Sequence, residues 1–187
     1  MENARDDMRA RREIFREGDI PVLEVSIGLP QGEEFPTGVT AYYRSLRETY
    51  ARQIEERILP AARAALLALP EQMRRFGFRR YRLTVRCRTE VCGGYLLVSR
   101  TTALTSPAGI RHRETCEVFT LPGGRLTPPL VFLRTVAGAL PRATRRYRRA
   151  DMTVTAQEAV LTAARGRQVR VQLPADAFKT AEAEQSK

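Results

Sequence analysis

The sequence is poor in lysine, cysteine and histidine, and each shortage argues against a class of protein. Of its 32 basic residues only Lys179 and Lys187 are lysines, so the positive charge of the body comes from arginine. The three cysteines are odd in number and form no CxxC pair, which argues against a disulfide framework and favours free thiols. His112 is the only histidine, so few combinations of side chains could bind a metal or act as acid and base.

Long apolar runs are also missing. The most apolar segment, Leu59 to Pro70, contains Arg63 and falls short of the roughly 20 residues that a membrane-spanning helix needs. The first residues, MENARDDMRARREIFREGD, mix charges of both signs without an apolar run, so they resemble neither a secretory signal nor an anchor. We therefore expect a cytoplasmic protein without membrane insertion.

The sequence has enough apolar residues to form the core of one domain, and it carries a large excess of positive charge. The chain has 187 residues, of which 43% are hydrophobic, and a formal net charge of +11. Guanidinium groups match phosphate and carboxylate groups with paired hydrogen bonds, so acidic partners are favoured. The alternative is that a GC-rich genome encodes arginine in place of lysine and that the charge serves solubility alone.

The pattern divides the chain into a polar arm, one domain and a tail. Residues 1–18 are expected to be a polar N-terminal arm or a frayed helix that ends at Gly18. Residues 19–178 form the single domain, which begins with a half-buried strand in IPVLEVSIGLP. Residues 179–187 are a polar tail that we expect to be disordered.

A long helix is predicted from Thr37 to Leu69, because apolar residues there recur every three or four positions. Pro60 lacks a backbone N–H, so the helix should kink or restart at that point. Tyr42, Tyr43 and Tyr50 belong to the apolar stripe, where they fit a core better than a platform for stacking bases.

A β-hairpin is predicted around Gly93-Gly94. A tight turn there pairs Val91 with Leu96, Thr89 with Val98 and Cys87 with Arg100. One face of this hairpin is then apolar with Arg100 as its only charge: Leu83, Val85, Cys87, Val91, Leu96, Val98 and Leu104. The other face carries four arginines: Arg80, Arg82, Arg86 and Arg88.

Further strands follow in the second half. One is expected over 110–121, and Gly123 and Gly124 fit a hairpin turn better than a phosphate-binding loop, since no GxxxxGK[ST] is present. A short apolar helix is expected over 131–140, and QVRVQLP alternates as a final strand. Residues 156–165 fit a helix or a strand equally well by local pattern.

The order of these elements, with the segments LLVSR, CEVFTLPGGRLTPPLVF and VRVQLP, resembles a bacterial domain of largely unknown function. That domain forms the extracytoplasmic part of RsiV-type anti-sigma factors, which are lysozyme receptors, and the N-terminal region of some peptidoglycan deacetylases. The resemblance covers Ile20 to Phe178. It implies an α+β fold in which one long helix packs on an antiparallel sheet of about five to seven strands, with strands in MTVTAQEAVLTAA.

The resemblance also implies a non-catalytic binding or sensing domain with an unknown protein or small ligand. Lysozyme binding does not transfer, for three reasons. The family's Gly-Gly-Ala-His turn is replaced by TSPAGIRH from Thr105 to His112, and the receptors' membrane helix has no counterpart. Lysozymes are also basic, so a partner of charge +11 would repel them at long range.

Arginine clusters are the main candidate site and give the alternative function. Nonspecific binding of nucleic acid or another anionic polymer would follow if the strand arginines met those of the connector PRATRRYRRAD. The anion-binding candidates are Arg80, Arg82, Arg86, Arg88, Arg142, Arg145, Arg146, Arg148 and Arg149. A solvated strand and a solvated loop are the simpler interpretation.

A third hypothesis is a zinc protein or hydrolase centred on His112, Glu114 and Cys116. Their two-residue spacing places them on one side of a strand, and Cys87 or Cys92 could add a fourth ligand. The spacing matches no standard zinc motif, and Cys116 beside Val118 fits a core thiol. We therefore expect no enzyme activity, no catalytic residues, no bound metal and no cofactor.

Overall fold

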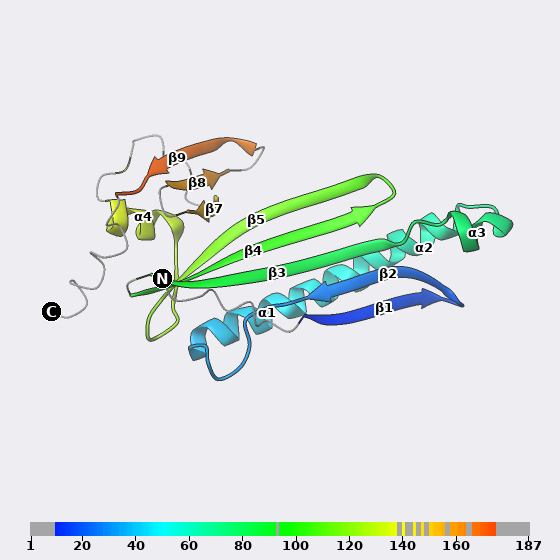
Figure 1. The fold of residues 1–187 in the computed structure, drawn as a ribbon, viewed down its shortest axis with the longest axis horizontal. Helices are drawn as coiled ribbons and strands as arrows, with labels where there is room; N and C mark the ends of the chain where they lie inside the picture. Colours follow the sequence, from blue (N-terminus) through cyan, green and yellow to red (C-terminus); the bar gives the residue numbers. More distant parts are fainter. Residues whose placement is uncertain are drawn as a thin grey trace.

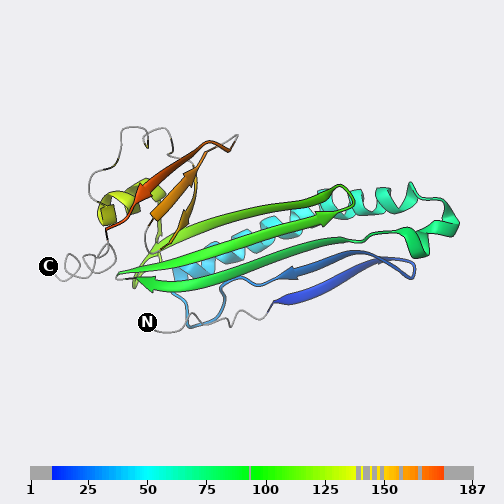
Figure 2. The ribbon, with the colours of Figure 1, turned by 45° about the horizontal axis from the view of Figure 1, so that its top comes forward.

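The computed structural model describes residues 10–92, 94–137, 140, 144, 147, 150–155, 158–163 and 166–174. Within them the chain forms two sheets: a six-stranded main sheet in the order β1-β2-β3-β4-β5-β6 and a small sheet in the order β7-β8-β9. The long helix lies across one face of the main sheet, and the small sheet covers one end of the opposite face (Figures 1 and 2). We call this opposite face the outer face.

The strands of the main sheet are β1 (Arg11–Glu17), β2 (Ile20–Ile27), β3 (Tyr81–Cys92), β4 (Tyr95–Ser106), β5 (Gly109–Thr120) and β6 (Leu126–Thr127). The predicted polar arm is wrong over Arg11–Glu17, which pair antiparallel with β2. A purely antiparallel sheet is also wrong, because β2 and β3 are parallel. The long helix connects these two strands and returns the chain to the end where β2 began, as a parallel crossover requires.

The predicted long helix is confirmed, and it runs without a break past Pro60. It consists of α1 (Thr37–Gln53), a wider π-helical turn, η1 (Ile54–Ile58), and α2 (Leu59–Leu67). Pro60 is the second residue after the π-helical turn, so its missing N–H falls where the regular α-helical hydrogen-bond pattern is already interrupted. A further helix that the pattern did not reveal, α3 (Glu71–Gly77), follows at the far end of the molecule (Figure 1).

The predicted hairpin is confirmed in its register. Val91 pairs with Leu96, Thr89 with Val98 and Cys87 with Arg100. Gly93, half of the predicted turn, lies outside the described residues. One expectation about its apolar face is wrong: Val91 is 65% exposed, because it lies near the end of β3, beyond the apolar core.

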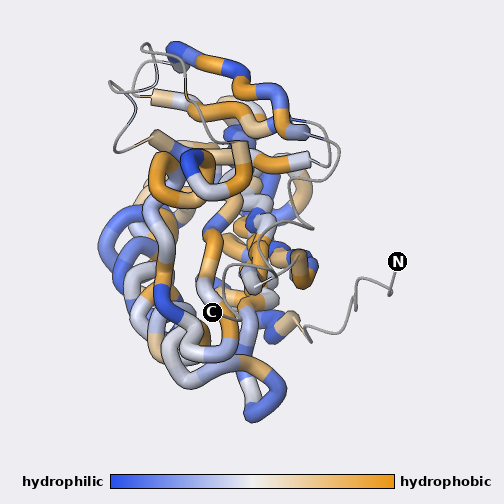
Figure 3. The backbone as a smooth tube through the Cα atoms, turned by 90° about the vertical axis from the view of Figure 1, so that its left-hand side faces the viewer, coloured by the Kyte–Doolittle hydropathy of each residue, from blue (hydrophilic) through white to orange (hydrophobic). Residues whose placement is uncertain are grey.

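The second half of the chain holds α4 (Pro129–Ala137) and the strands β7 (Asp151–Val154), β8 (Glu158–Thr162) and β9 (Gln168–Gln172). The choice of strands for the ambiguous segment is confirmed for its described part, since β7, β8 and β9 pair antiparallel. They form a second sheet rather than part of the first. Figure 3 looks along the long axis and shows this sheet as a separate layer at the top, with polar and apolar residues alternating along β9.

Two apolar clusters stabilise this arrangement. The first lies between the long helix and the main sheet and includes Val39, Tyr43, Val85, Val98 and Phe119, all at most 1% exposed. The second lies between the outer face of β4 and β5, α4 and the small sheet. The salt bridge from Arg113 on β5 to Asp151 on β7, at 2.7 Å, further ties the small sheet to the main one.

Candidate anion-binding site

An arginine-lined pocket opens where the start of β2, the end of α3, the start of β3 and the end of β4 meet. Its volume is about 460 Å³. Four of its lining residues are arginines: Arg75, Arg79, Arg80 and Arg82. The remaining wall is formed by Ile20, Pro21, Phe78 and Thr105.

In the stretch FGFRRYR, aromatic residues that pack against the core are interspersed with the arginines and hold the segment in position. Phe78 ends α3 in an extended conformation, and both Phe78 and Tyr81 pack against the first apolar cluster. Phe78 also forms part of the pocket wall, and Arg79, Arg80 and Arg82 line the pocket beside it. The helical residue Arg75 completes it from the other side.

A single buried carboxylate, Glu24 on β2, organises this end of the sheet. Its oxygens lie 2.9 Å from Arg12, 3.2 Å from Arg80 and 3.3 Å from Arg82, and its side chain is 9% exposed. Burial raises the pKa of Glu24, but the three guanidinium groups lower it more, so the net pKa lies below its ordinary value. Glu24 is therefore ionised at neutral pH and holds Arg80 and Arg82 in place.

Positive charge exceeds negative charge at the pocket. Glu24 supplies one negative charge for three arginines, and within the described chain neither Arg75 nor Arg79 forms an ion pair with a carboxylate. Among the described residues, the guanidinium groups of Arg75 and Arg79 thus lie beside an open pocket without an ion-paired carboxylate. Phosphate and carboxylate groups are the ligands that such forks bind best.

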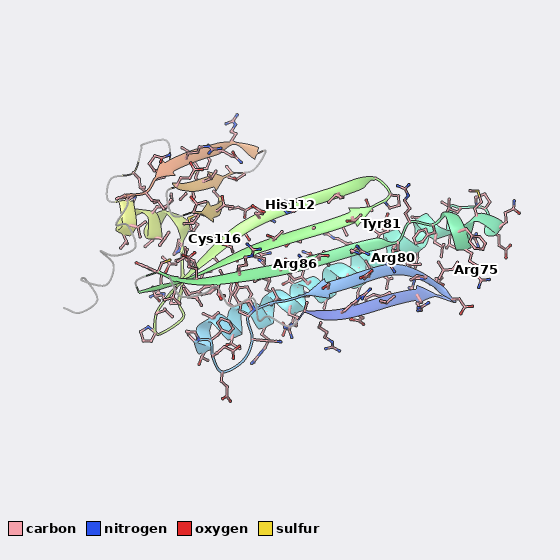
Figure 4. All side chains as sticks on the ribbon, viewed as in Figure 1. Arg75, Arg80, Tyr81, Arg86, His112 and Cys116 are labelled. Atoms are coloured by element: carbon pink, nitrogen blue, oxygen red, sulfur yellow. The ribbon has the colours of Figure 1, made fainter. Side chains whose placement is uncertain are left out.

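The structure separates the predicted arginine candidates into three sets. Arg80 and Arg82 line the pocket, whereas Arg86 and Arg88 are exposed further along β3 and do not. Figure 4 shows the separation along the strand between the labelled Arg80 and Arg86. The connector arginines Arg142, Arg145, Arg146, Arg148 and Arg149 lie outside the described residues.

The sequence pattern does not reveal Arg75, Arg79 or Glu24 as site residues. Arg79 falls just before the alternating strand, and Arg75 lies in a helix too short to show a period. Alternation assigns Glu24 to the polar side of β2, and that side is covered by arginines from two neighbouring strands. The available signal is a lone carboxylate inside an otherwise apolar strand, which requires a cationic partner if it is buried.

The predicted zinc set does not assemble among the residues described. His112 and Glu114 are both more than half exposed, with 3.8 Å between Nε2 and Oε1. Cys116 is buried in the second apolar cluster, and Cys87 lies in the first cluster on the other face of the sheet. No group of three potential metal ligands occurs in the described part of the chain. Burial raises the pKa of both cysteines to about 12, which makes them poor nucleophiles.

Fold and site together define an α+β domain with a cationic pocket at one end of its main sheet. A scan of protein-family models finds no match to the chain, and a comparison with curated proteins finds none either. Among the described helices, none is long and apolar enough to cross a membrane.

Proposed function

We propose that this protein is a non-catalytic binding domain whose ligand carries phosphate or carboxylate groups and occupies the arginine-lined pocket. The observation that carries the proposal is the charge of that pocket. Four arginines line it, and in the described part of the chain the carboxylate that pairs with them is Glu24, which Arg12 also shares. Charge-assisted hydrogen bonds from planar guanidinium groups would supply both the affinity and the orientation of the anion.

The proposal agrees with the resemblance to RsiV-type sensor domains, since both describe a domain that binds and performs no chemistry. Two features support this comparison. A long helix packs across a sheet, and three long antiparallel strands follow it in the chain. We retain the cytoplasmic location as part of the proposal, based on the sequence pattern alone.

Replacing Arg79 with alanine is expected to weaken binding of inorganic pyrophosphate about 10- to 100-fold, the range of one charge-assisted hydrogen-bond set. Arg79 is the best site for this test because it lines the pocket without being one of the three partners of Glu24. Isothermal titration calorimetry at fixed ionic strength gives the affinity.

Arg86→Ala is the matched control, because it removes the same charge from an exposed position on β3 outside the pocket. We expect it to change pyrophosphate affinity less than about twofold, since an exposed charge at a distance is screened by salt. Equal losses in the two variants would show that net charge rather than the pocket attracts the anion. Absence of pyrophosphate binding to the unmodified protein would contradict the proposal directly.

Nonspecific nucleic-acid binding is the second candidate function, and the exposed Arg86 and Arg88 favour it. Both are on the outer face of β3, on the same side as Arg82. The double variant Arg86→Ala/Arg88→Ala is expected to reduce the salt dependence of oligonucleotide affinity, by about 0.7 in logarithmic slope for each phosphate that is no longer neutralised. Fluorescence anisotropy with a single-stranded oligonucleotide over a salt series measures this slope. An unchanged slope would remove these two arginines from the nucleic-acid hypothesis.

A further inference from the structure

The tip of the molecule beside the pocket carries an exposed apolar surface. It is formed by Leu67 at the end of α2 and by Met73 and Phe76 on α3, whose exposed fractions are 60%, 52% and 89%. This tip lies at one end of the long axis, and the small sheet lies toward the other (Figure 1). The three side chains come from two helices that contact each other, and exposed apolar patches on a surface mark interaction sites.

The tip is held in a defined shape. Arg74 donates hydrogen bonds from Nε to the carbonyl of Leu69, at 3.1 Å, and from Nη2 to that of Leu67, at 3.2 Å. These bonds tie α3 to the end of α2 and use carbonyl groups that the helix leaves without partners. Met73 and Phe76 are three residues apart in α3 and therefore lie on adjoining parts of its surface.

The apolar tip and the arginine-lined pocket adjoin each other. Phe76 follows Arg75 and precedes Phe78 and Arg79, and these three neighbours all line the pocket. Glu71, in the first turn of α3, is the only acidic residue of that helix. An apolar projection thus stands next to a site with an excess of positive charge.

We propose that this tip binds the surface of a membrane that contains anionic phospholipids. Headgroup phosphates would bind in the arginine-lined pocket, and Phe76 and Met73 would enter the layer between headgroups and acyl chains. Aromatic side chains favour that layer, and arginines near it are attracted by anionic lipids. This inference rests on the proposed phosphate-binding function and requires no segment that crosses the bilayer.

Other occupants fit the tip less well. A stable protein interface buries about 800 Å² on each partner, more than a projection of three side chains supplies. Single-stranded nucleic acid uses aromatic rings as stacking platforms, and Leu67 and Met73 offer no ring. Binding to a lipid surface, by contrast, requires only a few inserted side chains with cationic groups beside them.

Co-sedimentation with phosphatidylglycerol vesicles tests the inference, with phosphatidylcholine vesicles as the neutral comparison. We expect the protein to bind the phosphatidylglycerol vesicles and to bind the phosphatidylcholine vesicles much more weakly or not at all. Phe76→Ser should lower the partition coefficient about 10-fold or more, as expected for a buried aromatic side chain, and leave pyrophosphate affinity unchanged. Arg79→Ala should lower both. Val131→Ser, at an exposed apolar position on α4, is the matched control and should lower neither.

The two proposals fail separately in this experiment. Pyrophosphate binding without binding to anionic vesicles, or equal vesicle binding by Phe76→Ser and the unmodified protein, would overturn the membrane inference and leave the phosphate pocket standing. If the unmodified protein binds neither pyrophosphate nor anionic vesicles, both the phosphate pocket and the membrane inference are overturned. A Phe76→Ser variant that binds vesicles normally but has lost affinity for a single-stranded oligonucleotide would identify nucleic acid as the occupant. Because Phe76 is exposed, the variant should fold normally, and circular dichroism verifies this.

Discussion

Replacing Glu117 with glutamine is expected to lower the free energy of unfolding by about 3–5 kcal/mol, as for other buried ion pairs that lose one partner. Glu117 on β5 lies beneath α1, where its carboxylate accepts hydrogen bonds from Arg100 Nε at 3.1 Å and Nη2 at 2.5 Å. The two side chains are only 10% and 13% exposed. The substitution would leave the Arg100 guanidinium buried without a countercharge.

Hydroxyl groups from the helix complete this buried network. Tyr43 donates to Glu117 at 3.2 Å, and Arg100 donates from Nη1 to the Tyr50 hydroxyl at 2.7 Å. Burial and the adjacent carboxylate raise the pKa of Tyr43 well above its ordinary value, so this hydroxyl stays protonated and can donate. The helix therefore contacts the sheet through polar groups that hydrogen-bond to one another. Removing one of these groups should lower the free energy of unfolding, because its partners would stay buried without a hydrogen bond.

Urea unfolding of Glu117→Gln and Glu114→Gln measures the effect. Glu114 is on the same strand but on the outer face, where its side chain is 59% exposed, so its replacement should change stability by about 0.5 kcal/mol or less. A loss below about 1 kcal/mol for Glu117→Gln would contradict the prediction, because that is the range of exposed pairs.

Replacing Gly124 with alanine is expected to destabilise the protein by roughly 2–4 kcal/mol, from two causes. Gly124 has a φ of +68°, which costs an L-residue about 1–2 kcal/mol. An added Cβ would also lie 2.7 Å from Cβ of Pro36 and 3.0 Å from the backbone nitrogen of Val39, and such overpacking costs about 1–3 kcal/mol. The loop after β5 is therefore packed directly against the start of α1.

The neighbouring Gly123 is the control. A Cβ at Gly123 would meet nothing within 4 Å, and its φ is not in the left-handed region. Gly123→Ala should therefore be neutral or stabilise the protein by up to about 1 kcal/mol through the unfolded chain. Thermal unfolding of the two variants makes the comparison, and similar melting temperatures would show that the loop is not held against the helix.

The local sequence pattern is sufficient to predict contacts between residues that are close together in the chain. The register of the β3–β4 hairpin follows from its turn, and the buried stripe that includes Tyr43 and Tyr50 follows from helical spacing. The turn at Gly123 and Gly124 follows from the glycine pair, and β5 and β6 do pair around it. The close approach of Gly124 to the helix does not follow from the pattern, since it joins segments far apart in the chain.

For the buried Arg100–Glu117 ion pair, the local sequence pattern predicts one partner but not the other. Alternation along β4 identifies Arg100 as a lone charge on an apolar face, and such a charge needs a partner. Glu117 can be identified only once β5 is aligned with β4, with Val98 opposite Glu117 and Arg100 opposite Thr115. That alignment places the carboxylate diagonally next to the guanidinium group.

Apolar spacing is enough to predict the long helix, and the glycine pair with the alternation around it is enough to predict the central hairpin. Packing in three dimensions makes β2 parallel to β3, extends the sheet with Arg11–Glu17 and separates β7–β9 into a second sheet. Packing also creates the site, because Glu24 and the pocket arginines come from β2, α3, β3 and the segment between α3 and β3. The physical reason is that alternation specifies the face on which a side chain lies, whereas the neighbour across that face depends on contacts between distant parts of the chain.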